Sequence, residues 1–476
     1  MSLFSTHASH SAVICGIRLQ PCLPRWARCV VLRGDCGVRS IHGGALPVMP
    51  AVSSVPTVGE QTLRRVNRRL MPYLILLYIV AYLDRVNVGY AGLQMTRELG
   101  FSNAVFGLGG GIFFIGYCLL EIPGGVLAEV WSARKWMARI LVTWGFLASA
   151  TGLIHTAAQF YWLRFFLGLA EAGFLPALLV YISHWYRPAD RGKAIAMFMA
   201  GIPASQILGG PLSAVLLKVQ WLGYSGWRWL LVLEGAPALV LGVVTIFVLT
   251  ERPQEAKWLR PEERAWLVGE LERERATRTS DAPAWKALGN PRVLLLAVTL
   301  FLGLTATYGV SLWMPKIVEK LSAFGVSGVS LIASLPYLFA LPSMVATGWH
   351  SDRTNERRWH ASIPRLAAGP ALAVCIFSSE HVWISVAALA VAASGFYSSH
   401  AGFWPMPNMI LGRAAAAASI GLINLCGNLG GFVGPYLIGF LTDKTGGFGA
   451  SLLFLAGCSV ASGLLILCVR LPDKGT

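Results

Sequence analysis

The sequence predicts an all-α membrane protein with twelve transmembrane helices arranged as two pseudo-repeats of six. Three observations predict this fold class. Of the 476 residues, 55% are hydrophobic and only 13% are charged, whereas about 25% of an ordinary soluble protein is charged. Long apolar runs recur along the chain in two groups of six. A short polar pattern also repeats at the same place in each group.

The apolar runs are long enough to cross a bilayer, because a spanning helix needs about 20 largely apolar residues. The first six runs lie near 70–91, 103–127, 136–155, 159–183, 194–217 and 229–250. The second six lie near 292–314, 326–348, 363–379, 383–411, 417–440 and 449–469. They divide the chain into an N-terminal six-helix bundle over 59–250, a cytoplasmic linker over 251–291 and a C-terminal six-helix bundle over 292–476.

The segment between the bundles is rich in alternating charge, which is typical of a solvated, partly helical linker. A Pro-Glu-Glu-Arg sequence begins at Pro261 and is followed by leucines. This pattern predicts an amphipathic helix that lies along the membrane face.

Residues 1–58 are expected to be a disordered tail, or an upstream extension ahead of a start at Met49. Residues 1–48 contain five Arg, a single acid (Asp35) and no apolar run long enough to span a membrane. A transit peptide, which is Arg-rich and poor in acids, is the alternative interpretation.

The net charge of +16 would suggest a nucleic-acid partner in a soluble protein. Here the basic residues fall mainly in short segments on one side of the predicted spans, and the positive-inside rule assigns that side to the cytoplasm. We therefore expect a multi-pass protein of the cell inner membrane with both termini in the cytoplasm and no nucleic-acid partner. The residues assigned to the cytoplasmic side include Arg64, Arg68, Arg134, Arg187, Arg353 and Arg365.

The repeated polar pattern follows the second run of each group. It consists of a Gly, an acid four residues later and a basic pair nine and ten residues later. Glycine lets helices approach closely, and an acid near a helix end can pair with Arg or with a neighbouring helix N-terminus. We expect such residues to hold the two halves together on the cytoplasmic side and to separate when the halves rock apart. The predicted gating residues are Gly125, Glu129 and Arg134 in the first copy and Gly348, Asp352 and Arg357 in the second.

The paired six-helix halves and these two loops resemble the major facilitator superfamily, whose transporters alternate access by rocking two six-helix bundles. The alternative is that the loops are two unrelated basic segments that obey the positive-inside rule. The first copy departs from the family loop, because Val130 stands for the usual Arg and Ser132 for the usual Gly.

Ionisable residues inside the apolar runs are functional candidates, because each costs about 2.5–3.5 kcal/mol at the centre of a helix. Arg164 and Glu171 are seven residues apart in one predicted helix, about 10 Å along its axis. We therefore expect them to pair with Arg85 and Asp84 of the first run, and the alternative is a charge network that only fixes helix packing. The six candidates are Asp84, Arg85, Glu121, Arg164, Glu171 and Glu234, of which Glu121 and Glu234 lie nearer helix ends.

The two arginines suit a carboxylate ligand, because a guanidinium binds it bidentately and keeps its charge. A carboxylic acid removed from water favours the protonated form, whereas a nearby Arg keeps it ionised. An anion that engages the Arg would free the acid to bind a proton. This arrangement predicts linked binding of an anion and a proton.

The second half offers polar and aromatic groups. His400 and Trp404 are four residues apart, as are Asn424 and Asn428, so each pair shares a helix face. Packing of the Trp and interhelical bonds of the Asn are the alternative interpretations. We interpret His400 as an interior polar group rather than a proton relay.

Several long segments resemble the anion:cation symporter family, and the likeness runs over residues 68–445. They include LDRVNVGYA, EAGFLPALLVYISHWYRPADRGKA, WRWLLVLEGAPA and INLCGNLGGFVGPYLIGFLTDKTG. The chain looks most like the bacterial tartrate, nicotinate, phthalate and hydroxyphenylacetate transporters of that family. One departure is Arg413, where this branch usually has a small residue.

The resemblance implies a secondary transporter that imports a small organic anion, such as tartrate, an aromatic carboxylate or a sugar acid, with protons or sodium. It implies proton coupling through Asp84 and Glu171. An uncoupled facilitator or an exporter is the alternative. We expect a monomer in the bilayer that is no enzyme and uses no cofactor or metal, because the sequence has no catalytic constellation and no phosphate-binding Gly loop. The implied substrate-binding residues are Tyr82, Arg85, Tyr117, Arg164, Trp404 and Asn424.

Overall fold

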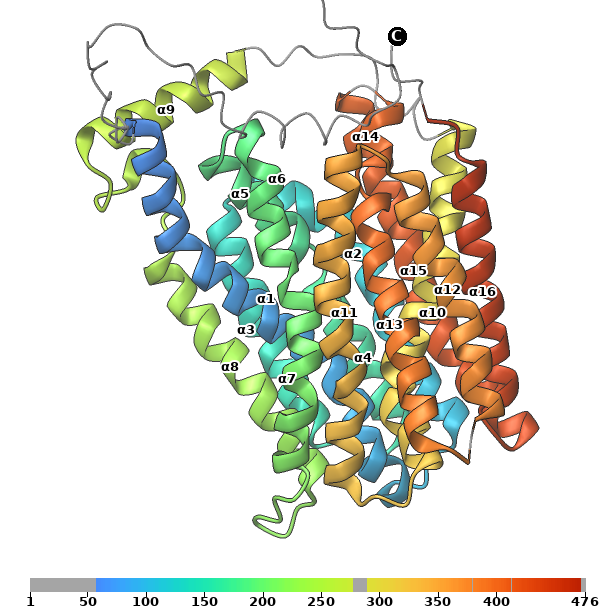
Figure 1. Ribbon diagram of the computed structural model, residues 1–476. Coiled ribbons are helices and arrows are strands. Elements are labelled where there is room, and N and C mark those ends of the chain that lie inside the picture. The colour runs from blue at the N-terminus through green and yellow to red at the C-terminus, as the bar shows by residue number, and fades with distance from the viewer. Residues whose placement is uncertain (1–56, 277–288, 379, 412, 472–476) are drawn as a thin grey trace, which may run out of the picture. The chain divides into compact units, whose positions relative to one another are not determined.

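The computed structural model describes residues 57–276, 289–378, 380–411 and 413–471, and nearly all of them are helical (Figure 1). No β-strand forms within these ranges. The predicted N-terminal tail lies outside the described residues up to position 56. The departure at Arg413 begins a helix, but its side chain also lies outside the described part of the chain.

Two groups of helices flank a short linker. The N-terminal group is α1 Val58–Glu98, α2 Asn103–Val130, α3 Ala133–Thr151, α4 Ala157–Glu171, α5 Phe174–Trp185, α6 Pro188–Met199, α7 Gly201–Leu216 and α8 Gly226–Val248. The linker contains the 3-10 helix Pro253–Glu255 and α9 Pro261–Ala276. The C-terminal group is α10 Pro291–Leu321, α11 Val326–Thr354, α12 Arg358–Phe377, α13 Val382–Phe403, α14 Met406–Ile410, α15 Arg413–Thr445 and α16 Gly449–Cys468.

Eleven helices, counted within the described ranges, are long and apolar enough to cross a membrane. Three of them consist of two pieces each, namely α4 with α5, α6 with α7, and α13 with α14. The remaining predicted span corresponds to α3, whose first turns carry Arg134, Lys135 and Arg139. This helix packs along α8, and the Ser149 hydroxyl donates to the Val232 carbonyl oxygen at 3.2 Å. The all-α membrane fold class is confirmed.

The first helix begins well before the apolar run that predicted it. Thr57 and Glu60 form a capping box, in which the Thr57 hydroxyl accepts from the Glu60 backbone N–H at 3.3 Å and the Glu60 carboxylate accepts from the Thr57 N–H at 3.2 Å. These bonds satisfy donors that a helix start leaves unpaired. Arg64 and Arg68 therefore lie on α1 itself and not in a loop.

Helix α9 begins at Pro261, as the sequence predicts. Two of its leucines, Leu267 and Leu271, are buried in the core of the N-terminal group. The buried carboxylate of Glu263 lies 3.3 Å from Arg65 Nε on α1. The apolar side of α9 therefore covers the end of the N-terminal bundle, and its expected position along the membrane face stays a prediction.

The two groups meet along three helix pairs, α2 with α15, α7 with α11, and α1 with α10, and Figure 1 shows α7 beside α11. Close approach depends on glycines in all three pairs, and the pair α2 with α15 gives two examples. A Cβ on Gly107 would lie 2.4 Å from the Pro435 carbonyl oxygen, and a Cβ on Gly439 would lie 2.2 Å from that of Asn103. No larger residue fits there without moving a backbone.

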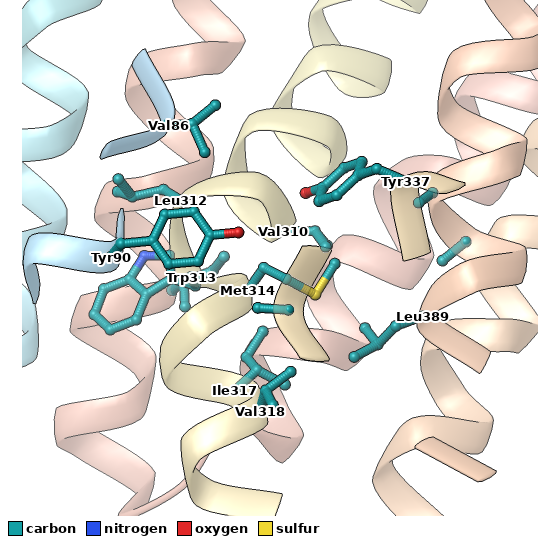
Figure 2. Close-up of a cluster of buried hydrophobic side chains, with 14 of the residues drawn as sticks. Val86, Tyr90, Val310, Leu312, Trp313, Met314, Ile317, Val318, Tyr337 and Leu389 are labelled. Atoms are coloured by element: carbon teal, nitrogen blue, oxygen red, sulfur yellow. The ribbon is translucent and has the colours of Figure 1, made fainter. Parts of the chain in front are cut away.

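A shared hydrophobic core lies beside these contacts (Figure 2). Val86 and Tyr90 of α1 belong to it, together with Trp313 of α10 and Leu389 of α13. Trp313 is fully buried, and its indole N–H donates to the Pro435 carbonyl oxygen at 3.0 Å. The core therefore contains residues of both groups and joins them.

Candidate functional site

A cavity between the two groups is lined by polar residues of both. The N-terminal group contributes Tyr78, Tyr82, Arg85, Tyr117, Arg164, Glu171 and Gln206. The C-terminal group contributes Thr307, Tyr308, Ser311, Tyr397, His400, Trp404, Asn424 and Asn428. All six residues with an expected substrate-binding role therefore line one cavity, together with Glu171, while their roles stay predictions.

Arg85 and Glu171 form the central ion pair of the cavity. Arg85 Nε donates to Glu171 Oε1 at 2.8 Å, and Arg85 Nη2 lies 2.5 Å from the same oxygen. Glu171 ends α4, and Gly173 follows with a left-handed φ of 84° that starts α5. The break turns the chain directly after the carboxylate. The expected pairing between the first and fourth spans is therefore present.

Aromatic rings surround the Arg85 guanidinium. Its central carbon lies 4.9 Å from the Tyr82 ring centroid, 5.4 Å from that of Phe113 and 5.0 Å from that of Tyr117. Such cation–π contacts stabilise a cation that has left water. Arg85 Nη1 also donates to the Tyr308 hydroxyl across the cavity at 3.5 Å. The Arg85 side chain is therefore fixed by both groups of helices.

Arg164 is held much less firmly. It is 3% exposed, its guanidinium lies over the Phe113 ring at 4.9 Å, and its Nε has no hydrogen-bond partner. Among the described residues, none forms an ion pair or a hydrogen bond with this guanidinium. Its donors therefore face the cavity without an acidic partner.

The expected ion pair between Asp84 and Arg164 is absent. Asp84 accepts instead from the Trp144 indole N–H at 2.9 Å and from the Asn87 amide at 3.4 Å, and it does not line the cavity. Trp144 belongs to α3, and no sequence pattern connects it to Asp84. The predicted pairing of Asp84 with Arg164 was wrong, because the Asp84 carboxylate accepts its hydrogen bond from a neutral indole on a third helix.

Glu121 of α2 connects the two groups. Its carboxylate accepts from the side-chain amides of Asn424 and Asn428 on α15, the latter at 3.1 Å. The i, i+4 spacing of the asparagines is visible in the sequence, but their common partner depends on how α2 and α15 pack. Sequence reasoning left the role of Glu121 open for this reason.

Two further ionisable residues are buried but do not line the cavity, Glu234 and Arg365. Among the described residues, none forms a hydrogen bond with either carboxyl oxygen of Glu234, and its polar neighbours are Asn87 and Asp84. Arg365 was expected in a cytoplasmic segment, yet it lies two turns inside α12 and is 2% exposed. It donates to the Gly303 carbonyl oxygen at 2.7 Å. Charge counting missed it because the helix begins at Arg358, before the apolar run.

The charged gating candidates pair within their own group of helices. Arg134 lies with its Nε 3.9 Å from the Glu251 carboxylate, which also caps the start of α3. Asp352 pairs with Arg357 at 2.5 Å. Among the described residues, none forms a hydrogen bond or ion pair with Glu129, whose side chain is exposed.

The two gating glycines occupy equivalent places in the two halves. Gly125 of α2 lies against Pro176 of α5, and Gly348 of α11 lies against Ala401 of α13. Each therefore packs the second span of its group against the fourth. Within the described part of the chain, no hydrogen bond or ion pair joins the two halves at the α9 end, so the gating role stays a prediction.

Polar contacts join the halves at the opposite end. The Asp443 carboxylate of α15 accepts from the backbone N–H groups of Asn103 at 3.2 Å and Ala104 at 2.7 Å, which begin α2. Arg97 forms an ion pair with Glu319. Over the described ranges, the hydrogen bonds and ion pairs between the groups extend from this end only as far as Glu121. The bundle is therefore closed at the end opposite α9.

The comparison with known proteins identifies the family. The family model described as Major Facilitator Superfamily matches residues 74–435. The chain belongs to this superfamily. It is similar to a putative tartrate transporter of Agrobacterium vitis, at 42% identity over 411 residues that cover 86% of this chain and 91% of the relative. It is also similar to a quinolone resistance transporter of Acinetobacter baumannii, at 40% identity over 400 residues that cover 83% of this chain and 92% of the relative.

Solved major facilitator structures share the fold. The xylose transporter XylE from E. coli, in an inward open conformation, superimposes with a TM-score of 0.70 at 15% identity, over 86% of this chain and 97% of that one. The predicted major facilitator fold is confirmed. The chain is a multi-pass membrane transporter and not an enzyme.

Proposed function

We propose that this transporter imports a small organic anion together with protons by alternating access. The observation that carries the proposal is the cavity between the halves, where the Arg85–Glu171 ion pair lies beside the unpaired guanidinium of Arg164. Arg164 offers a planar fork of donors that matches a carboxylate. The name of the tartrate transporter relative supports the class of substrate.

The same ion pair supplies a route to coupling. An incoming carboxylate that binds Arg85 competes with Glu171 for the guanidinium. Glu171 is buried, and a buried carboxylate that loses its cation favours the protonated form. Asp84, which is buried next to Arg85 in the sequence, is the second proton carrier of the proposal. Substrate and proton would therefore be bound and released together.

The distribution of basic residues supports the orientation. We assign the α9 end, with both termini, to the cytoplasm of a bacterial inner membrane, following the positive-inside rule. The contacts of Asp443 and Arg97 then close the outer end. In this arrangement the polar contacts between the halves, within the described residues, lie on the outer side and around the cavity, as we expect of the state that releases imported substrate.

Uptake into proteoliposomes tests the proposal. Labelled tartrate is supplied outside with an imposed inward proton gradient, with and without a protonophore. We expect accumulation above the external concentration, and we expect the protonophore to abolish it. Accumulation that persists with the protonophore would show that protons are not the coupling ion.

An exporter is the second candidate, because one relative is a quinolone resistance transporter. Everted membrane vesicles separate the two directions. Energised accumulation of a quinolone in such vesicles, without tartrate uptake in right-side-out ones, would favour export. We expect the reverse result.

A further inference from the structure

Asn424 and Asn428 lie one turn apart on α15, and both side-chain amide nitrogens donate to Glu121. The Asn424 nitrogen contacts Oε1 and the Asn428 nitrogen contacts Oε2. Glu121 is 6% exposed, and it lies behind the cavity wall rather than in it. One carboxylate therefore holds both amides at the same time.

This contact decides which end of each amide faces the cavity. An ionised carboxylate only accepts hydrogen bonds, so it binds the NH₂ ends of Asn424 and Asn428 and not their oxygens. The Oδ1 atom of an amide lies on the other side from its NH₂ group. Both asparagines line the cavity, and among the described residues none donates a hydrogen bond to either Oδ1. The wall at α15 therefore offers two hydrogen-bond acceptors.

The wall formed by the N-terminal group offers hydrogen-bond donors. Arg85 and Arg164 supply donors that suit a carboxylate. A ligand that matches both walls carries a carboxylate at one end and hydroxyl donors along its chain. A carboxylate without hydroxyl groups would leave the two acceptors unpaired, and sites built to bind a substrate hydroxyl reject analogues that lack it.

We propose that Glu121 is a positioning residue, which orients the Asn424 and Asn428 amides so that their oxygens select organic acids that carry hydroxyl groups. This inference rests on the proposed function, since it concerns specificity within the same cavity. It assigns Glu121 no contact with substrate. The selectivity depends on which end of each amide, the oxygen or the NH₂ group, faces the cavity.

Tartrate and succinate are the matched probes, because they share a four-carbon dicarboxylate skeleton and differ by two hydroxyl groups. The experiment measures how well each unlabelled acid competes for labelled tartrate exchange in proteoliposomes of the full chain. We expect the wild type to prefer tartrate by at least about tenfold. The preference is a ratio, so it does not depend on how much of a variant folds.

Glu121→Gln tests the positioning role. The new amide can accept from one Asn, but its own NH₂ group favours turning the other Asn so that a donor faces the cavity. We expect the preference for tartrate to fall about tenfold or more, mainly through weaker tartrate competition. The double variant Glu121→Gln with Asn428→Asp restores a carboxylate–amide pair and is expected to recover part of the preference.

Glu234→Gln is the matched control, because Glu234 is another buried acid of the same group and touches neither asparagine. We expect it to keep the wild-type preference. An unchanged preference in Glu121→Gln, or a wild type that prefers succinate, would overturn the inference and leave the proposed function intact. A wild type that exchanges neither acid nor any other organic anion would overturn both.

Discussion

At the scale of single residues, the cavity contains two arginines in different states. Arg85 is held by Glu171 and by three aromatic rings, whereas no acid in the described part of the chain forms an ion pair with Arg164. Burying a cation without an anionic partner costs free energy, so we interpret such a residue as one whose partner is a bound ligand. Arg164 is therefore the residue that we expect to bind the substrate carboxylate first.

Arg164→Lys tests this assignment, because it keeps the charge and removes the planar fork. We expect the KM for tartrate uptake to rise about tenfold, which corresponds to about 1.4 kcal/mol. Arg139→Lys is the control, since Arg139 lies over the Trp136 ring at 3.8 Å, on α3 and outside the cavity. An unchanged KM in Arg164→Lys would remove Arg164 from the site.

Part of this site could be predicted from the sequence, because a charge inside an apolar run must find a partner. That rule predicts the Arg85–Glu171 pair. It could not predict that the Trp144 indole would donate a hydrogen bond to Asp84, since the rule considers only charged residues. Nor could it predict that Glu121 binds Asn424, because the contact depends on the packing of α2 against α15.

At the scale of helices, the apolar runs located the spans but not all of their ends. Capping at Thr57 starts α1 three turns before its apolar run, and the break after Glu171 divides the fourth span. Hydrogen bonds of caps and the conformation of single glycines decide such features, and hydropathy records neither. The leucines after Pro261 predict a helix with an apolar side, and in the structure Leu267 and Leu271 pack on the N-terminal bundle.

The position of α9 depends on a row of ion pairs with the N-terminal bundle. Glu263 pairs with Arg65, and Glu270 lies 3.5 Å from Arg187. Arg191 binds Glu274 through two hydrogen bonds of 2.7 Å. Each partly exposed pair contributes about 0.2–1 kcal/mol, so only their joint removal should release the helix.

We predict that the triple variant Glu263→Gln, Glu270→Gln and Glu274→Gln speeds amide hydrogen exchange across α9, while exchange in the spans stays unchanged. Mass-spectrometric hydrogen exchange in detergent measures both. The exposed acids of the same helix supply the control, through Glu262→Gln with Glu272→Gln. Equal protection of α9 in both variants would show that its apolar contacts hold it alone.

At the scale of the whole molecule, the two halves are joined by polar contacts at the end opposite α9. Asp443 accepts hydrogen bonds from the first backbone N–H groups of α2, where the helix dipole favours an anion. Removing contacts worth a few kcal/mol changes a two-state population by tenfold or more. Asp443 is thus expected to stabilise the state that is closed at this end.

We predict that Asp443→Ala populates a second state that is open at the outer end. Spin labels at Trp221 and Phe324, which are exposed in the loops after α7 and α10, report the separation of the halves. The variant should add a longer distance that the parent lacks. Lys444→Ala, one residue away, should leave the distances unchanged, and a longer distance in both variants would contradict a specific role for Asp443.

The central claim is that the Arg85–Glu171 ion pair links anion binding to proton binding. Glu171→Gln removes the protonatable group and keeps the shape of the side chain. The most direct measurement compares tartrate counterflow with accumulation driven by a proton gradient in the same proteoliposomes. We predict that counterflow persists and that gradient-driven accumulation is lost. Accumulation at the wild-type level in Glu171→Gln would contradict the claim.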